Sequence, residues 1–194
     1  APSRTGLIAV PDSIPRLAVL AFSNLGPAAD SFLADGITAE LGSRLSGLAG
    51  LALLSPSSAK AFKGSDKSPR EFGREMGADY VLFGNVLWNR SIDGQTTVRV
   101  IPEMIRVADD TQVWSAQLDR AFENTLTVQS EIALEVVEQL RVTLSAPERN
   151  SLGAAATDNP LAWEAYLKGI QVLPKGHGAE KDFRQGRMLL EQAI

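Results

Sequence analysis

The segment from Asp79 to Arg120, DYVLFGNVLWNRSIDGQTTVRVIPEMIRVADDTQVWSAQLDR, decides the fold of this chain. Runs of β-branched, aromatic and aliphatic residues alternate in it with turn-forming residues, which predicts three antiparallel strands in a meander. Asp93-Gly94 favours a two-residue type I′ turn in the first hairpin, because both central residues of that turn need a positive φ. Ala108-Asp109-Asp110-Thr111 is expected to form the second turn and to lead into a third strand at Gln112–Leu118.

The predicted first turn also fixes the pairing of the hairpin. With Asp93-Gly94 at its centre, Trp88 lies opposite Arg99, and the two side chains form either a cation–π pair or a recognition surface. Pro102 has no N–H to donate to a ladder, so it should mark a bulge or an unpaired edge position.

Hydrophobic periodicity and capping residues predict the remaining elements of an α/β (α+β) domain. They are a strand at Arg16–Phe22, a helix from Asp30 or Ser31 to Leu48 with a stripe of Leu33, Ile37, Leu41, Leu45 and Leu48, a strand at Leu51–Ser55, a short helix at Ser57–Phe62, a helix from Pro69 to Gly77 with Ser68 as its N-cap, and a long amphipathic helix at Leu126–Leu144. The prediction is a mixed sheet that ends in an antiparallel meander and has helices packed on it.

The predicted domain organisation has four parts. Residues 1–15 contain three prolines and form a linker, and residues 16–145 form the α/β domain. Residues 146–158 are polar and small, which predicts a second linker, and 159–194 are expected to form a pair of helices. The chain stops inside a helical pattern, so we expect it to be a piece of a longer protein.

Composition limits the classes of function. The 194 residues carry a formal net charge of −4, which argues against nucleic acid as the main partner. The absence of cysteine excludes disulfides and thiolate metal sites within the chain. No apolar run approaches the roughly 20 residues that a membrane-spanning helix needs.

The search for catalytic residues finds no constellation that commits the chain to a reaction. His177 is the only histidine and lies between two glycines, which favours a solvent-exposed loop residue over a catalytic base. Asp109-Asp110 could bind a cation, but adjacent carboxylates at a turn more often serve turn geometry. No phosphate-binding glycine motif is present. We therefore predict no catalytic residue, no metal ligand and no cofactor.

Asn24, Asp30 and Asp35 form the one candidate ligand site. They lie in and after the loop predicted at Ser23–Ala29, at the carboxyl end of a central strand, where open α/β sheets often bind ligands. The alternative is that these side chains cap the following helix and shape its loop.

Residues 16–144 resemble the TolB N-terminal-like domain of bacterial multidomain signalling proteins. The resemblance is carried by four segments in the order of the family: RLAVLAFSNL at 16–25, FLADGITAEL at 32–41, FGREMGADYVLFGNV at 72–86 and VWSAQLDR at 113–120. It implies a module that lies between an output domain and a run of tetratricopeptide repeats. The leader VPDSIP at 10–15 is similar to the linker that follows a class III adenylate or guanylate cyclase domain.

The tail from Pro160 to Ile194 is similar to a tetratricopeptide repeat helix pair, with Trp163, Tyr166, Gly169 and Ala193 at matching positions. Repeats of this type commonly provide concave protein-binding surfaces. With Trp88 and Arg99, Trp163 and Tyr166 are therefore the candidate interaction surface, and the tail is a candidate for self-association.

Two functions remain open at this point. The favoured one is a non-catalytic sensing or protein-interaction module, the C-terminal regulatory part of a bacterial adenylate or guanylate cyclase, whose partner is a protein or the attached output domain. The alternative is a small-molecule or nucleotide-binding domain with its site at the first β-α loop. The family resemblance implies a bacterial protein, and the cytoplasm is favoured over the periplasm.

Overall fold

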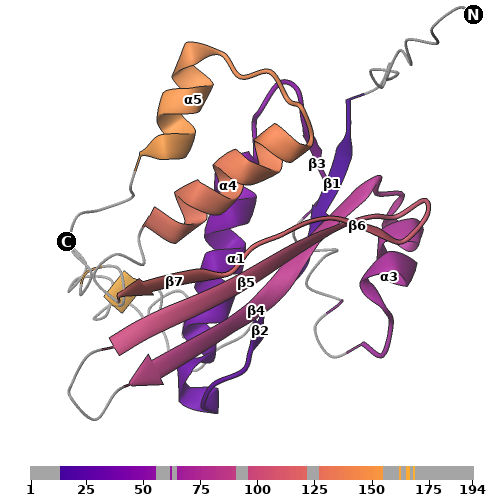
Figure 1. Cartoon of the computed structure of the whole chain (residues 1–194). Coiled ribbons are helices and arrows are strands. Elements are labelled where there is room, and N and C mark those ends of the chain that lie inside the picture. The colour runs from indigo at the N-terminus through magenta and orange to yellow at the C-terminus, as the bar shows by residue number, and fades with distance from the viewer. Residues whose placement is uncertain are drawn as a thin grey trace, which may run out of the picture.

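The structure is a computed structural model, and it describes residues 14–55, 62, 65–90, 96–121, 127–154, 162, 165, 166 and 168 (Figure 1). The strands are β1 (Arg16–Val19), β2 (Ser23–Asn24), β3 (Ala52–Leu53), β4 (Tyr80–Arg90), β5 (Thr96–Arg106), β6 (Thr111–Ser115) and β7 (Leu118–Ala121). The helices are the 3-10 turn η1 (Ala28–Asp30) and the α-helices α1 (Ser31–Leu45), α3 (Pro69–Met76), α4 (Val128–Gln139) and α5 (Ala146–Gly153). Within the described residues the strands form one mixed sheet of seven, in the order β3-β1-β4-β5-β6. The predicted α/β (α+β) class and its meander are confirmed.

The parallel half of the sheet is centred on β1. Leu17 lies opposite Leu53 of β3 on one side and opposite Tyr80 of β4 on the other. Parallel neighbours need a crossover connection, which α1 supplies between β1 and β3. Ser23 and Asn24 form the short strand β2 instead of the predicted loop. β2 pairs with β4 beyond the point where the pairing of β1 with β4 ends.

The antiparallel half differs from the prediction in its register. β4 and β5 pair from Tyr80 opposite Arg106 to Arg90 opposite Thr96, so Trp88 lies opposite Val98. The register predicted from the Asp93-Gly94 turn is therefore wrong by one residue, and no Trp88–Arg99 pair forms. The turn dipeptide itself lies outside the described residues.

Burial explains the observed register. Opposite residues of an antiparallel pair share one face of the sheet, and a slip of one residue moves every side chain to the other face. The residues of the two strands that belong to the larger core cluster all have even numbers and are at most 7% exposed: Leu82, Val86, Trp88, Val98, Val100 and Met104. Both strands bury their even-numbered residues on the same face only if even-numbered residues lie opposite each other. The free energy gained by this burial outweighs the preference of a turn dipeptide.

Pro102 lies opposite Gly84 inside the ladder, and its carbonyl accepts the N–H of Ala116 at 3.2 Å. Since the N and O of a strand residue point to the same side, the missing donor of Pro102 faces the break between β6 and β7, where no ladder bond is lost. The prediction of a bulge or an unpaired edge position is therefore wrong for Pro102, which pairs with Gly84 in an internal strand, and the bulge lies two residues later, between Met104 and Ile105. The second turn is confirmed, but the predicted third strand is divided into β6 and β7.

Two hydrophobic clusters hold the helices on opposite faces of the sheet. The larger one joins α1, α4 and α5 to the even-numbered face of β4 and β5, and the smaller one joins α3 to residues such as Val81 and Ile105. In Figure 1 the strands β4 and β5 pass in front of α1, while α3 lies at one end of the sheet. The apolar stripe predicted for α1 is buried, but the helix ends at Leu45, because Gly47 adopts a φ of 84°.

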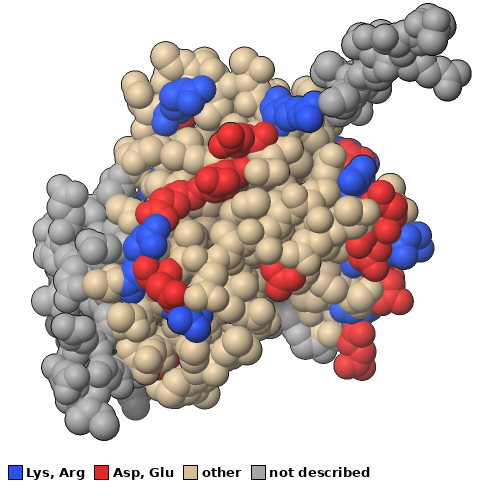
Figure 2. All heavy atoms as spheres, in the orientation of Figure 1, with Lys and Arg blue, Asp and Glu red and all other residues tan. Residues whose placement is uncertain are grey.

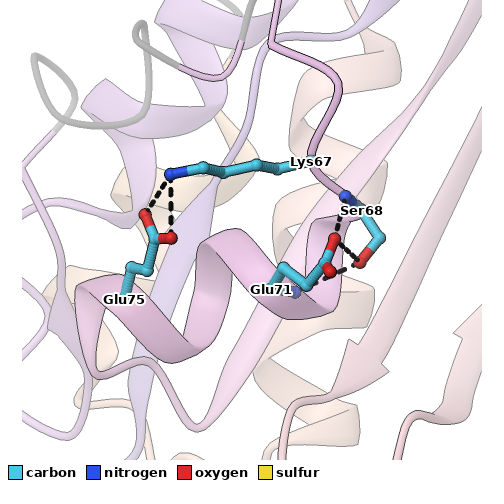
Figure 3. A network of polar contacts seen from close by, with 4 residues as sticks. All are labelled: Lys67, Ser68, Glu71 and Glu75. Atoms are coloured by element: carbon cyan, nitrogen blue, oxygen red, sulfur yellow. Dashed lines mark hydrogen bonds and ion pairs between the residues drawn. The ribbon is translucent and has the colours of Figure 1, made fainter.

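Local sequence chemistry fixes both ends of α3. Ser68 and Glu71 form a reciprocal capping box, in which Glu71 Oε2 accepts the Ser68 N–H at 2.8 Å (Figure 3). These bonds, first the one from the Ser68 backbone, lower the pKa of Glu71. Lys67 Nζ lies 2.6 Å from Glu75 Oε2 across the same helix. Gly77, with a φ of 67°, ends the helix as predicted.

α4 is shorter than predicted. A linker was predicted at 146–158, but residues 146–153 of it form the helix α5. Ser145 and Glu148 form a second capping box, and Leu152 is buried against the larger cluster. The side chain of Arg44 on α1 donates to the carbonyls of Leu152 and Ala154 at 3.1 and 2.7 Å, while Glu148 accepts the N–H of Ala49 at 3.0 Å. Residues 146–153 are therefore a docked helix, which Arg44 of α1 holds at one end and the backbone of Ala49, after α1, holds at the other.

The beginning of the predicted tail helix is present. Residues 162, 165, 166 and 168 are helical, and Ala162 is 7% exposed. The short helix predicted at Ser57–Phe62 and most of the predicted tetratricopeptide-type hairpin lie outside the described residues. In the part of the chain that the structure describes, no helix has the length and apolar character needed to cross a membrane.

Candidate functional site

The first β-α loop is held in place by the helix that follows it. Thr38 on α1 accepts the N–H of Phe22 at 2.9 Å and donates its own hydroxyl to the carbonyl of Ala34 at 2.8 Å. These two hydrogen bonds hold the chain between β1 and Asn24 against α1.

Asn24 uses its side chain to fold this loop. Its Nδ2 donates to the carbonyls of Gly26 and Pro27 at 3.1 and 2.7 Å, and its Oδ1 accepts the Gly26 N–H at 3.1 Å. Both amide hydrogens and one acceptor position are thereby committed within four residues. The geometry favours the loop-shaping role over a ligand contact for Asn24.

Asp30 ends η1 and Asp35 lies in the first turns of α1, after the loop that Asn24 shapes. Asp30 is at the N-cap of α1 and only 3% exposed, but its side chain makes no capping hydrogen bond, so the predicted side-chain cap is absent. Asp35 is half-buried one turn further along. A cavity of about 510 Å³ lies at the opposite end of β1, beside Pro15 and Tyr80. None of the three predicted ligand residues lines that cavity.

The structure separates the two hairpin residues of the predicted interaction surface. Trp88 is buried, with its ring 5.6 Å from that of Phe32 in an edge-to-face contact, so it belongs to the core. Arg99 points to the other face and forms a two-point ion pair with Asp119 across β5 and β7, with distances of 2.6 and 3.2 Å. Arg99 and then Gln117 lower the pKa of Asp119 by hydrogen bonding to its carboxylate, and the same pair raises the pKa of Arg99.

The face of the sheet that carries Arg99 is broad and mostly uncharged away from α3. Leu87 and Ile101 point to this face and are half-buried, and neither belongs to a core cluster. Figure 2 shows few charged side chains over the central part of β4 and β5. Sequence reasoning missed this surface because it used the wrong register, which placed these residues with the core set.

The tail contributes one described contact with the domain. Lys168 Nζ lies 5.2 Å from the centroid of the Phe32 ring, and Tyr166 is 39% exposed. The tail thus contacts α1 of its own chain at this point. Trp163 lies outside the described residues.

The candidate acidic pair serves the turn that contains it. Asp109 Oδ1 accepts the N–H of Thr111 at 3.2 Å and lies 3.4 Å from Arg106 Nε, and Asp110 has a φ of 61°. A hydrogen bond from the side chain of Thr111 is the main cause that lowers the pKa of Asp109, and the bond from its backbone adds to it. Among the residues with described positions, no three acidic or histidine side chains come together in a way that could hold a metal ion. His177 lies outside them.

Comparison with known proteins gives one relative by sequence. Over 160 residues the chain is 31% identical to a Rhizobium meliloti protein named "Putative adenylate cyclase 3". The match covers 82% of this chain and 26% of the relative, so the chain spans about a quarter of that protein's length. No family model matches the chain.

Solved structures show partial similarity. TolB from Acinetobacter baumannii matches with a TM-score of 0.48 and 15% identity, over 68% of this chain and 29% of that one. A PelC dodecamer protein from Paraburkholderia phytofirmans matches with a TM-score of 0.45 and 22% identity, over 66% and 89%. Lipoprotein GNA1162 from Neisseria meningitidis gives 0.44 and 18%, over 67% and 99%. With TM-scores below 0.5, these similarities do not establish a common fold.

Proposed function

We propose that this chain is a non-catalytic regulatory segment of a bacterial signalling protein with a class III adenylate or guanylate cyclase domain, and that it acts through contacts with other protein segments. The observation that carries the proposal is the match of 160 residues to a quarter of the Rhizobium meliloti protein, whose name assigns it cyclase activity. In this proposal the protein is cytoplasmic, and the tail begins a tetratricopeptide region.

The regulatory unit extends from β1 to the end of α5. The contacts of Arg44 and Glu148 join α5 to α1 and to the segment that follows it, so we place the end of the unit at about Gly153 instead of at Ser145. Its sheet face around Leu87 and Ile101, where few side chains are charged, is the surface that we assign to the attached cyclase segment, because burying apolar area is the main source of affinity in protein contacts. The second candidate, a ligand site at the first β-α loop, has less support because Asn24 is committed to its own loop.

The Rhizobium meliloti relative offers the test. Three proteins are compared for cyclic AMP formation: the whole relative, the relative without its matching segment, and the relative with this chain in place of that segment. We expect removal to change the rate by about fivefold or more, the lower end of allosteric coupling, and replacement to restore it. This chain alone should form no cyclic nucleotide.

Two variants locate the effect on the surface. Leu87→Asp in the replacement protein should prevent restoration, whereas Ser151→Asp, which adds the same charge at an exposed position of α5, should leave it intact. If the whole relative makes no cyclic AMP, or if removal of the segment leaves the rate unchanged, the proposed function is wrong.

A further inference from the structure

The cavity at the amino-terminal end of β1 and β4 is formed by three segments that are far apart in the sequence. Pro15 comes from the start of β1, Arg74 and Tyr80 from α3 and the start of β4, and Arg106 and Val107 from the end of β5. Its volume of about 510 Å³ lies within the range of about 300–1,000 Å³ that is usual for small-molecule sites. It is distinct from the first β-α loop, which lies at the other end of β1.

Arginine side chains converge on this cavity. Arg74 and Arg106 line it, and the guanidinium of Arg16 lies beside Gly77, with Nη1 3.0 Å from the point where a side chain of residue 77 would begin. Arg70 braces the wall by donating to the carbonyls of Val107 and Ala108 at 3.3 and 3.2 Å. Four arginines therefore lie at or beside the cavity, although the net charge of the chain is −4.

The carboxylates near the cavity, one of which (Asp79) lines it, neutralise only part of this charge. Asp79 accepts the backbone N–H of Arg16 at 2.8 Å, and Asp109 lies 3.4 Å from Arg106. The side chains of Arg16 and Arg74 make no ion pair or hydrogen bond with another residue in the described part of the chain. Glu71 on α3 also interacts electrostatically with Arg74. Four arginines against these three carboxylates still leave a positive excess at the cavity.

A structural role accounts for part of this arrangement. Arg74 lies in the last turn of α3, and Arg16 lies beside its C-cap Gly77, where a positive charge complements the helix dipole. That role does not involve Arg106, which comes from β5, and it does not require a cavity with apolar walls. The combination of Arg74, Arg106 and the walls at Tyr80 and Val107 is typical of a site for an anion that has an apolar body.

We propose that this cavity binds a small organic anion, whose phosphate or carboxylate group lies between Arg74 and Arg106 and whose apolar part packs against Tyr80 and Val107. A guanidinium presents a planar fork of N–H donors, which matches the oxygens of either acid. The bound anion joins the starts of β1 and β4 to the end of β5. This inference is independent of the proposed cyclase context.

The test is an NMR titration of the ¹⁵N-labelled chain in phosphate-free buffer of low ionic strength. Phenyl phosphate carries a phosphate on an apolar ring, and benzoate carries a carboxylate on the same ring. Benzyl alcohol has the ring without a charge, and inorganic phosphate has the charge without a ring. We expect saturable shifts of the amides of Ala78, Tyr80 and Val107 with phenyl phosphate or benzoate, and whichever of the two binds more tightly identifies the acid. Benzyl alcohol and inorganic phosphate should bind more weakly than that probe.

Variants decide whether the arginines make the site. Arg106→Gln, and separately Arg74→Gln, should weaken binding of the tighter probe by about tenfold, as expected for a charge-assisted hydrogen bond. Arg149→Gln removes the same charge from an exposed position on α5 and should leave binding unchanged. If one glutamine variant does not fold, the other and Arg106→Lys, which keeps the charge without the fork, still test the site. The proposal is overturned if no probe gives saturable shifts at the cavity, or if Arg149→Gln weakens binding as much as the cavity variants do.

Discussion

At the scale of single residues, Gly84 shows how tightly the centre of the sheet is packed. A Cβ at this position would lie 2.4 Å from the carbonyl oxygen of Ile101 and 2.6 Å from Cε1 of Phe22. Gly84→Ala should therefore lower the free energy of unfolding by about 1–3 kcal/mol, the usual cost of overpacking a core. Urea denaturation of both proteins measures the difference.

Gly42 provides the matched control for that substitution. It lies inside α1, and a Cβ there would meet no atom within 4 Å. Gly42→Ala should raise the free energy of unfolding by about 0.5–1 kcal/mol, because glycine loses more backbone freedom than alanine when a helix forms. Equal effects of the two substitutions would mean that the close packing at Gly84 is not as described.

At the scale of elements, the two capping boxes show what the sequence predicts well. Ser68 and Ser145 each precede a glutamate by three residues, and each pair closes the first turn of a helix. Ser68 as N-cap and Pro69 as the first helical residue predict the first helix, whereas the polar and small residues at 146–158 predict a linker in place of the second. α5 buries only Leu152 and has no apolar stripe, so its stability comes from Arg44 and Glu148, contacts that periodicity does not reveal.

The first hairpin shows the opposite failure. Its turn dipeptide predicted one register, and the alternation of Val98, Val100 and Met104 against Leu82 and Val86 required another. The alternation of apolar residues is visible in the sequence and by itself predicts the observed register. It prevails because a register slip would expose a whole set of core residues, whereas an unfavourable turn costs far less.

Glu148 makes the docking of α5 dependent on pH. Hydrogen bonds from Ser145 and then from the Ala49 N–H lower the pKa of Glu148 from 4.5 to about 2. Since the folded-state pKa is depressed, the stabilisation is complete above pH 4.5 and is lost as the pH falls from 4.5 toward 2. Wild type should be more stable than Glu148→Gln at pH 6, and this gap should narrow steadily down to pH 2.5.

Urea unfolding of both proteins across this pH range measures the gap. Glu135→Gln, at an exposed position on α4, is the control for the loss of one carboxylate. A gap between wild type and Glu148→Gln that stays constant between pH 6 and 2.5 would contradict the role of the Glu148 carboxylate.

Arg44 should anchor the other end of α5. Its side chain is 8% exposed and also lies 3.0 Å from Glu40, so Arg44→Met removes a nearly buried hydrogen-bonding centre. We expect a loss of about 1.5–3 kcal/mol, the usual contribution of hydrogen bonds to a charged group. Hydrogen exchange of the α5 amides should accelerate before that of β4. Unchanged exchange of α5 would show that Leu152 alone holds the helix.

At the scale of the whole molecule, the order of elements was predictable and the convergence of distant side chains was not. The parallel strands, their crossover helix and the meander follow from hydrophobic patterns along the chain. The arginine-lined cavity needs Arg16, Arg74 and Arg106, which are separated by more than thirty residues at their closest. The sequence around each of these arginines does not indicate a site, and only the sheet order β1-β4-β5 brings them together.

The tail decides whether the molecule associates with itself. The sequence predicts a tetratricopeptide-type tail with Trp163 and Tyr166 on its surface, which makes the tail a candidate for self-association. The described contacts favour packing within one chain instead, because Ala162 is 7% exposed and Lys168 lies over the ring of Phe32. We therefore expect the chain to be monomeric by light scattering at high concentration, with the amides of Ala162 and Tyr166 protected from hydrogen exchange. Ala162→Glu should accelerate that exchange by about tenfold or more, since it places an unpaired charge in a buried position, whereas Ser151→Glu should not. A full chain that dimerises, beside a monomeric chain ending at Ala154, would show that the tail packs on a second copy.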